Sequence, residues 1–362
     1  MSKLAVFVFL IGFVLAGCTT IGPQSVSRDR FDYNKAISDS WKEQTLLNIV
    51  KLRYADMPLF VEVASIVSGY TLESAVNLSA RIYDGGSPAE FGTTNFGSIG
   101  GSGKYTDRPT ITYAPITGRE FNKTFMTPIP PSAVLFMVQA GWPAGMVLPL
   151  TLEAINGHRA QRSIGMRQEA GQAGFYRIIE LFAMLQRAGA VGMRVDKTDS
   201  TRDSTVIVIR RDRVSPEIMA ASEELAQLLG IRGDAAEYTV AYGEVARNDT
   251  ELAMLTRSTL AIMVEMAGQV RVPAEHVQDG RAPASLADKD DADSDKRRLI
   301  DIHSGRVKPN DALAAVKYRD HWFWIDDRDF RSKRTFAYLM LLFSLTESGG
   351  KEGLPLVTIP AG

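Results

Sequence analysis

The densest group of residues that could do chemistry is the stretch KYRDHWFWIDDRDF, residues 317 to 330. It holds two of the chain's four tryptophans, one of its four histidines and four aspartates. Tryptophan and tyrosine bury apolar surface and keep a polar edge, so aromatic rings beside acids are typical of a ligand-facing patch. The sequence therefore predicts a ligand patch made by Tyr318, Asp320, His321 and Trp322.

The same stretch also fits a structural role. With a period of two it completes a strand from Ala312 to Ile325 that is apolar on both faces at its end. Residues 326 to 329 then leave the sheet, and an aspartate or Ser332 can cap a helix that carries Phe336. The sequence is therefore compatible with two interpretations of this stretch: a ligand patch, or a strand that leads into a capped helix.

Paired carboxylates could make this stretch catalytic. Glycosidases use two carboxyl groups about 5 to 9.5 Å apart, and Asp320, Asp326 and Asp327 are the candidates here. A Ser/His/Asp set of Ser304, His321 and Asp326 is conceivable, but no nucleophile elbow surrounds the serine. We assign no catalytic residue and keep a cell-wall or glycan hydrolase as the alternative function.

Motifs for metals and cofactors are weak. No histidine shares the short H-E-x-x-H spacing with another histidine or a carboxylate: His158, His276, His303 and His321. The aspartates at 291, 293 and 295 lack the glycine and final glutamate of a calcium loop. Residues 97 to 106 fail the P-loop pattern, and two glycines separate Ser348 from Lys351 where a serine–lysine pair needs a helical turn. We expect no metal site and no cofactor.

The N-terminus carries chemistry of another kind. MSKLAVFVFLIGFVLAGCTT has one cation at Lys3, an apolar or glycine run over residues 4 to 17, and then Cys18, the only cysteine. A short basic region, an apolar core and small residues before a cleavage site are how a secretory signal is built. The run is shorter than the roughly 20 residues that span a bilayer. The sequence predicts a cleaved signal peptide over residues 1 to 17.

Leu15-Ala16-Gly17-Cys18 resembles the lipobox of bacterial lipoproteins. The resemblance implies that Cys18 becomes the first mature residue and carries a diacylglyceryl group and an acylated amino terminus, with fatty chains such as palmitate. Each buried CH₂ contributes about 0.8 kcal/mol, so several chains anchor stably. Thr19 stands where the inner-membrane retention signal would be Asp, which implies the inner leaflet of the outer membrane, facing the periplasm.

A second resemblance concerns the body of the chain. The segments RSTLAIMVEMAGQVRVPAEH, DIHSGRVKP and VKYRDHWFWIDDRDFRSKRTFAYL, with LLNIVKLRYADMPLFVEVASIV nearer the start, resemble an uncharacterised family of proteobacterial envelope proteins. The resemblance covers roughly the C-terminal third and that one earlier segment. It implies a place in the cell envelope and supplies no activity and no functional residues.

Composition narrows the partners. Without its signal peptide the chain loses only Lys3 of its 41 basic residues and keeps 42 acidic ones, and no basic block stands out, which argues against nucleic acid. An apolar content of 45% supports a proper core. We interpret the protein as a lipid-anchored binding, assembly or accessory component of the envelope. Its expected partners are the bilayer, through Cys18, and envelope proteins or the cell wall.

The expected fold class is α+β, with mixed sheets, packed helices and two modest domains. After the signal peptide we expect a lipidated tether over residues 18 to 37, an N-terminal α+β region with Gly/Pro-rich loops over 38 to 165, and a C-terminal α+β domain over 170 to 362 with a mobile charged loop over 271 to 298. A long, glycine-rich and flexible hairpin tip or loop is expected over residues 85 to 103. Helices are expected from Ser40 to Tyr54 and over 175–189, 216–229, 252–270 and 336–345; strands over 76–82, 109–116, 204–212, 236–242, 299–303, 312–325 and 354–360.

Overall fold

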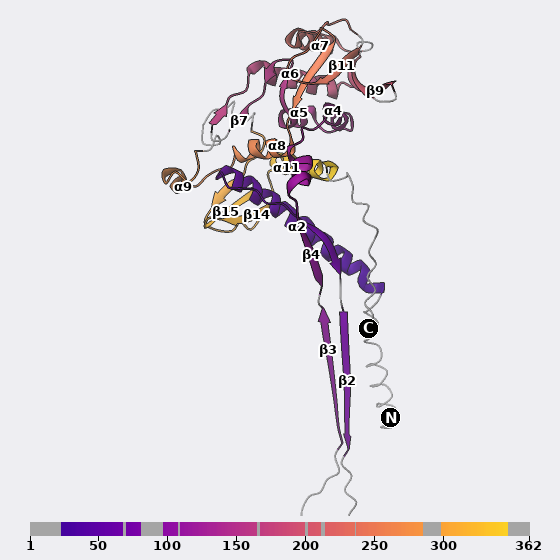
Figure 1. Cartoon of the computed structure of the whole chain (residues 1–362), viewed down its shortest axis with the longest axis vertical. Coiled ribbons are helices and arrows are strands. Elements are labelled where there is room, and N and C mark those ends of the chain that lie inside the picture. Colours follow the sequence, from indigo (N-terminus) through magenta and orange to yellow (C-terminus); the bar gives the residue numbers. More distant parts are fainter. Residues whose placement is uncertain are drawn as a thin grey trace, which may run out of the picture. The chain divides into compact units, whose positions relative to one another are not determined.

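A computed structural model of the chain describes residues 23–67, 70–80, 97–107, 109–164, 167–199, 202–210, 214–235, 237–284 and 298–346. They belong to two compact units: the larger contains the described residues of 23–60 and 117–346, and the smaller those of 61–116. Helices and mixed sheets confirm the α+β class (Figure 1). No helix among these residues is long and apolar enough to cross a membrane. Cys18, the aspartates at 291 to 295, Ser348, Lys351 and the expected closing strand lie outside the described residues.

Helix α2 (Pro23–Arg53) is much longer than the helix predicted from Ser40 onward. Proline suits a helix start because the first N–H groups have no partner inside the helix. Up to Gln44 no described side chain of α2 is buried, whereas Leu46, Ile49 and Val50 are fully buried. The apolar periodicity of the sequence predicted only the part of α2 that packs against the rest of the unit. Residues 23 to 37, which were predicted as a tether, also belong to the helix.

The smaller unit contains four strands in two antiparallel pairs. β1 (Val61–Val67) pairs with β4 (Thr110–Pro115), and β2 (Tyr70–Ala80) pairs with β3 (Gly97–Asp107) without a bulge. None of their described side chains is buried. Residues 97 to 103, predicted as part of a hairpin tip or loop, are paired in β3. Glycine can form a strand there because ladder hydrogen bonds use only the backbone.

The larger unit contains a six-stranded mixed sheet in the order β6-β5-β12-β11-β10-β9, in which only β11 and β12 are parallel. This sheet joins residues on both sides of position 165, so the predicted domain boundary there is wrong. Its strands are β5 (Leu152–Ile155), β6 (His158–Arg159), β9 (Val191–Asp199), β10 (Arg202–Ile209), β11 (Glu237–Tyr242) and β12 (Glu251–Thr256). A separate short hairpin consists of β7 (Arg162–Ile164) and β8 (Arg167–Glu169).

Helices pack around this sheet. Two of them lie close to their predicted ranges. α6 (Ala173–Arg187), expected over 175–189, buries one apolar face that includes Phe175, Ile178 and Phe182. α7 (Pro216–Leu229) follows the cap Ser215, which accepts a hydrogen bond from the Ile218 N–H. Gly230 ends α7 in the left-handed region at φ 64°. The remaining helical segments before α6 are α3 (Gly118–Phe121), the π-helical turn η2 (Asn122–Met126), α4 (Pro131–Gln139) and α5 (Ala144–Thr151).

The helix predicted over 252–270 is wrong. Its first part is the central strand β12, and only α8 (Thr259–Ala267) is helical, with Ser258 as its cap. Leu252, Ala253 and Met254 are consecutive and all buried. A strand with apolar residues on both faces loses the period-two signature and is hard to tell from a buried helix.

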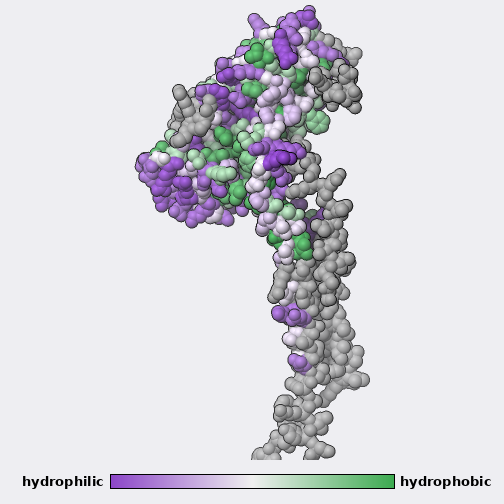
Figure 2. All heavy atoms as spheres, in the orientation of Figure 1, coloured by the Kyte–Doolittle hydropathy of each residue, from purple (hydrophilic) through white to green (hydrophobic). Residues whose placement is uncertain are grey.

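A three-stranded sheet in the order β13-β15-β14 carries the stretch singled out in the sequence. The single strand predicted over 312–325 is a hairpin of β14 (Ala312–Tyr318) and β15 (His321–Asp326), with Arg319 and Asp320 in its turn at φ 47° and 66°. β13 (His303–Gly305) precedes it, and α11 (Phe330–Thr346) follows, confirming a helix there. The surface over β14 and β15 is mainly hydrophilic in Figure 2.

The prediction of a mobile charged loop over residues 271 to 298 is wrong for residues 274 to 278. They form the short helix α9 (Ala274–Gln278), whose His276 is 2% exposed. Arg53 of α2 ties the following segment down by donating to the carbonyls of Pro283 and Ala284. Residues 285 to 297 lie outside the described part.

Candidate functional site

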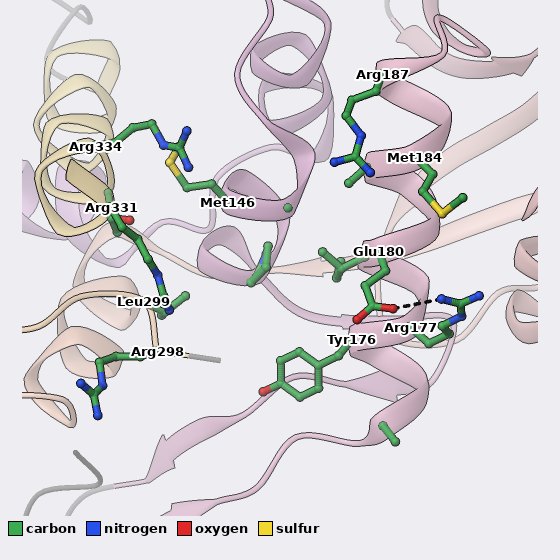
Figure 3. Close-up of a pocket in the computed structure, with 16 residues that line it drawn as sticks. Met146, Tyr176, Arg177, Glu180, Met184, Arg187, Arg298, Leu299, Arg331 and Arg334 are labelled. Atoms are coloured by element: carbon green, nitrogen blue, oxygen red, sulfur yellow. Dashed lines mark hydrogen bonds and ion pairs between the residues drawn. The ribbon is translucent and has the colours of Figure 1, made fainter. Parts of the chain in front are cut away.

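Five arginines and one glutamate surround a cavity of about 630 Å³ in the larger unit. Figure 3 shows that they come from separate elements: Arg331 and Arg334 from α11 and Arg298 from the segment before β13 on one side, the α6 residues on the other. The volume lies in the range of small-ligand pockets, roughly 300 to 1,000 Å³. The charged lining residues are Arg177, Glu180, Arg187, Arg298, Arg331 and Arg334.

Helical spacing explains how α6 supplies one wall. Its apolar stripe, which includes Phe175, Ile178 and Phe182, is buried against the rest of the unit. Tyr176, Glu180, Ala183 and Arg187 follow one another at intervals of four, three and four residues, which places them together on another face. In the same way, Arg331, Arg334 and Thr335 share one face of the first turns of α11.

Two of the arginines are already engaged with acids. Arg177 donates to both oxygens of Glu224, at 2.7 and 2.8 Å, and to Glu180 at 3.0 Å, and these hydrogen bonds hold its pKa above the ordinary value. Arg298 lies 3.3 Å from Asp301. These two arginines therefore have less capacity left for a ligand.

Arg334 and Arg187 differ from these. The Nε atom of Arg334 is buried without a hydrogen-bond partner among the described residues, and its guanidinium lies over the Phe330 ring at 5.8 Å. Within the same residues Arg187 is exposed and no hydrogen bond or ion pair is found for it. An unsatisfied buried donor costs about 1 to 3 kcal/mol, more when charged, so an acceptor beside Arg334 would be stabilising.

The cavity combines this charge with apolar surface. Met146, Pro149, Ile179, Met184 and Leu299 line it beside the arginines. Guanidinium groups match carboxylate and phosphate oxygens in geometry and charge. The arrangement suits a small anion that also carries an apolar part.

The predicted ligand patch does not come together. Tyr318 and His321 are paired across the hairpin and share a face, and the Tyr318 hydroxyl donates to Asp56 at 2.8 Å. Trp322 points to the opposite face, where the Lys308 ammonium lies 5.1 Å from its ring centre. Asp320 sits in the turn between the strands. The four residues divide because the expected strand turns back on itself.

The carboxylates of this stretch have structural partners. Asp320 and Asp326 flank the length of β15, about 20 Å apart at 3.3 Å per residue, which is well beyond the separation of a glycosidase pair. Asp326 accepts the Arg328 N–H at 2.8 Å, and Asp327 pairs with Lys333 at 2.7 Å. Asp329 caps α11 by accepting the Ser332 N–H at 3.1 Å. The prediction that an aspartate caps this helix is confirmed for Asp329.

A cluster that the sequence did not indicate joins α9 to the β14–β15 turn. Glu275, His276 and His321 each offer a ligand atom within 4.8 Å of the other two. His321 Nε2 is 3.0 Å from Glu275 Oε1, and His276 Nδ1 is 2.7 Å from the Tyr54 hydroxyl. Burial lowers the pKa of His276 and raises that of Tyr54 to about 12. Because 45 residues separate the two histidines in sequence, no local spacing signals the cluster.

The other two histidines have separate surroundings. His158 Nε2 contacts the Leu228 carbonyl at 2.8 Å. His303 stacks on Trp324 with ring centres 5.6 Å apart and lies 3.8 Å from Asp301. Among the described residues no hydrogen bond joins Ser304 to His321 or to Asp326, so a Ser/His/Asp triad is not assembled there.

Comparisons with known proteins add no assignment. No family model matches this chain, and no curated protein and no solved structure is significantly similar to it.

Proposed function

We propose that this protein is a lipid-anchored component of the bacterial cell envelope that binds a small amphipathic anion in the cavity between α5, α6 and α11. The observation that supports it best is the cavity lining. Five arginines and one glutamate surround about 630 Å³ in a chain whose net charge is only −1. Such a local excess of cations beside apolar side chains favours a ligand with a phosphate or carboxylate head and an apolar tail.

The envelope part of the proposal rests on the sequence. Leu15-Ala16-Gly17-Cys18 resembles a lipobox, and Thr19 favours the inner leaflet of the outer membrane, facing the periplasm. Acyl chains on Cys18 would hold the protein at the bilayer. Envelope proteins or the cell wall are then the further partners within reach.

The hydrolase alternative has less support. It requires two carboxylates at a defined separation in an open cleft. Asp320 and Asp326 are too far apart, and the acids at the end of β15 are occupied by Arg328, Lys333 and the start of α11. A binding role needs none of these acids.

Calorimetry with hexyl phosphate and with hexanol as its uncharged partner tests the cavity. The full chain should bind hexyl phosphate and not hexanol. Arg187→Gln and Arg334→Gln should each weaken binding about tenfold, since one charge-assisted hydrogen bond contributes roughly 1.5 kcal/mol. Arg232→Gln, which removes an exposed guanidinium paired with Asp234 away from the cavity, is the matched control. Equal affinity of all three variants would place the ligand elsewhere.

The anchor is tested separately. Cys18→Ser should leave the protein unprocessed or release it from the membrane fraction, with loss of the mass of the acyl groups. Unchanged mass and unchanged membrane association would refute the lipoprotein assignment while leaving the cavity untouched.

A further inference from the structure

Two buried imidazoles and one carboxylate meet where α9 packs against the β14–β15 turn. His276 is 2% and His321 6% exposed, and their ring centres lie 4.9 Å apart at 74°. Glu275 contributes a carboxylate from the rim, 45% exposed. Polar groups that are this buried usually serve a fixed partner.

We infer that Glu275, His276 and His321 form a binding site for one divalent transition-metal ion, with Zn²⁺ the best match. Two imidazole nitrogens and a carboxylate oxygen are a common protein ligand set for zinc, and three protein ligands leave the fourth position open. Calcium and magnesium prefer sets made only of oxygen atoms. The site is independent of the arginine-lined cavity, since the two share no residue.

The hydrogen bonds around the cluster leave ligand atoms where a metal needs them. His276 Nδ1 contacts the Tyr54 hydroxyl, and no hydrogen bond of its Nε2 is found among the described residues. His321 Nε2 lies 3.0 Å from Glu275 Oε1. With a metal on that nitrogen, the ring N–H would be on Nδ1, which lies 3.5 Å from the Arg319 carbonyl. Metal-bound histidines typically hold their second ring nitrogen in this way.

The backbone around the cluster is unusual. Ala55, Arg319 and Asp320 are three of the four non-glycine residues with positive φ among the described residues, and they directly follow Tyr54 or precede His321. Such conformations cost about 1 to 3 kcal/mol each and concentrate at functional sites. They flank His321 itself and Tyr54, whose hydroxyl contacts His276.

One neighbour opposes the metal. Arg306 donates to both oxygens of Glu275, at 2.7 and 3.0 Å, and its side chain is 74% exposed. An exposed ion pair of this kind is weak, so the carboxylate can exchange Arg306 for a metal. Removal of Arg306 should therefore strengthen metal binding, an effect that a purely structural role of Glu275 would not produce.

Zinc binding to the full chain, measured by competition with a chromophoric chelator, tests the site. We expect one zinc ion per chain and a visible absorption band when Co²⁺ replaces it. Glu275→Gln should weaken zinc binding at least tenfold, and His321→Gln should abolish it. Arg306→Gln should tighten it about two- to fivefold, because the competing cation is gone.

His303→Gln is the matched control, because this histidine lies on another part of the same sheet, and its affinity should equal that of the unaltered chain. Circular dichroism establishes whether each variant is folded. If His321→Gln unfolds, the zinc affinities of Glu275→Gln and Arg306→Gln, which change exposed side chains, still test the site. A chain that binds no stoichiometric zinc, or affinities that neither Glu275→Gln nor Arg306→Gln changes, would overturn the inference.

Discussion

Arg257 and the arginines of the cavity use the same side chain for opposite purposes. Arg257 is 4% exposed and donates to the backbone carbonyls of Pro149, Leu150 and Gln161. Arg334 has a buried Nε without a partner among the described residues, and Arg187 is exposed on the cavity wall. An arginine that donates to three of the protein's own carbonyls holds the fold together, whereas one with an unused donor beside a cavity can bind a ligand.

The largest effect should follow from Arg257→Met. The change leaves three carbonyls and the nearby Glu265 without their cation, so we expect a loss of about 3 to 5 kcal/mol in the free energy of unfolding. Urea denaturation measures it. Arg187→Gln should change stability by less than about 0.5 kcal/mol, as for an ordinary surface position. Equal losses in the two variants would erase the distinction between the structural and the binding arginine.

A smaller effect should follow from Gly174→Ala, at the start of the helix that forms one cavity wall. A Cβ there would lie 2.6 Å from Nδ1 of His158, whose ring is held by the Leu228 carbonyl. Overpacking of this kind costs about 1 to 3 kcal/mol. Gly145→Ala is the control, because its Cβ meets only Ala183 at 3.8 Å. Thermal unfolding of both variants shows whether packing behind α6 fixes the cavity wall.

The smallest effect concerns pH. Burial raises the pKa of Glu265, against the nearby Arg257 and the hydrogen bonds from Ser163. The folded chain therefore keeps this proton where the unfolded chain has lost it, so stability falls as pH rises from the unfolded value, near 4.5, through the folded pKa. Glu265→Gln cannot titrate, and its stability relative to the unaltered chain should rise over that range. Parallel curves of stability against pH would contradict the shift.

Regular amphipathic segments were predictable. α6 and α7 were predicted within about two residues because apolar spacing and a glycine after the last turn agreed in both, and Ser215 marked the start of α7. The helix over 252–270 and the strand over 312–325 failed for the opposite reason. Buried strands such as β12 lack alternation, and a turn made by Arg319 and Asp320 carries no glycine or asparagine to mark it.

Neither site was predictable from local patterns. The cavity gathers arginines from residues 177 to 334, and the histidine cluster joins α9 to β15 across a segment expected to be a solvated loop. The residues of each site become neighbours only when elements that are distant in sequence pack together. The aromatic stretch drew attention because its residues are adjacent in sequence, yet of its four predicted patch residues only His321 belongs to a site proposed above.

The length of α2 has a consequence for where any ligand or partner can be met. Trp41 is the first of its described side chains with a ring contact to another element, 6.3 Å from Phe343, so about 27 Å of helix precedes the part that packs, at 1.5 Å per residue. If Cys18 carries the acyl chains, the anchor lies five residues before the helix begins. The helix then acts as a spacer whose length approaches the thickness of a bilayer, and shortening it in whole turns would draw the body of the protein toward the lipid surface by about 5.4 Å at a time.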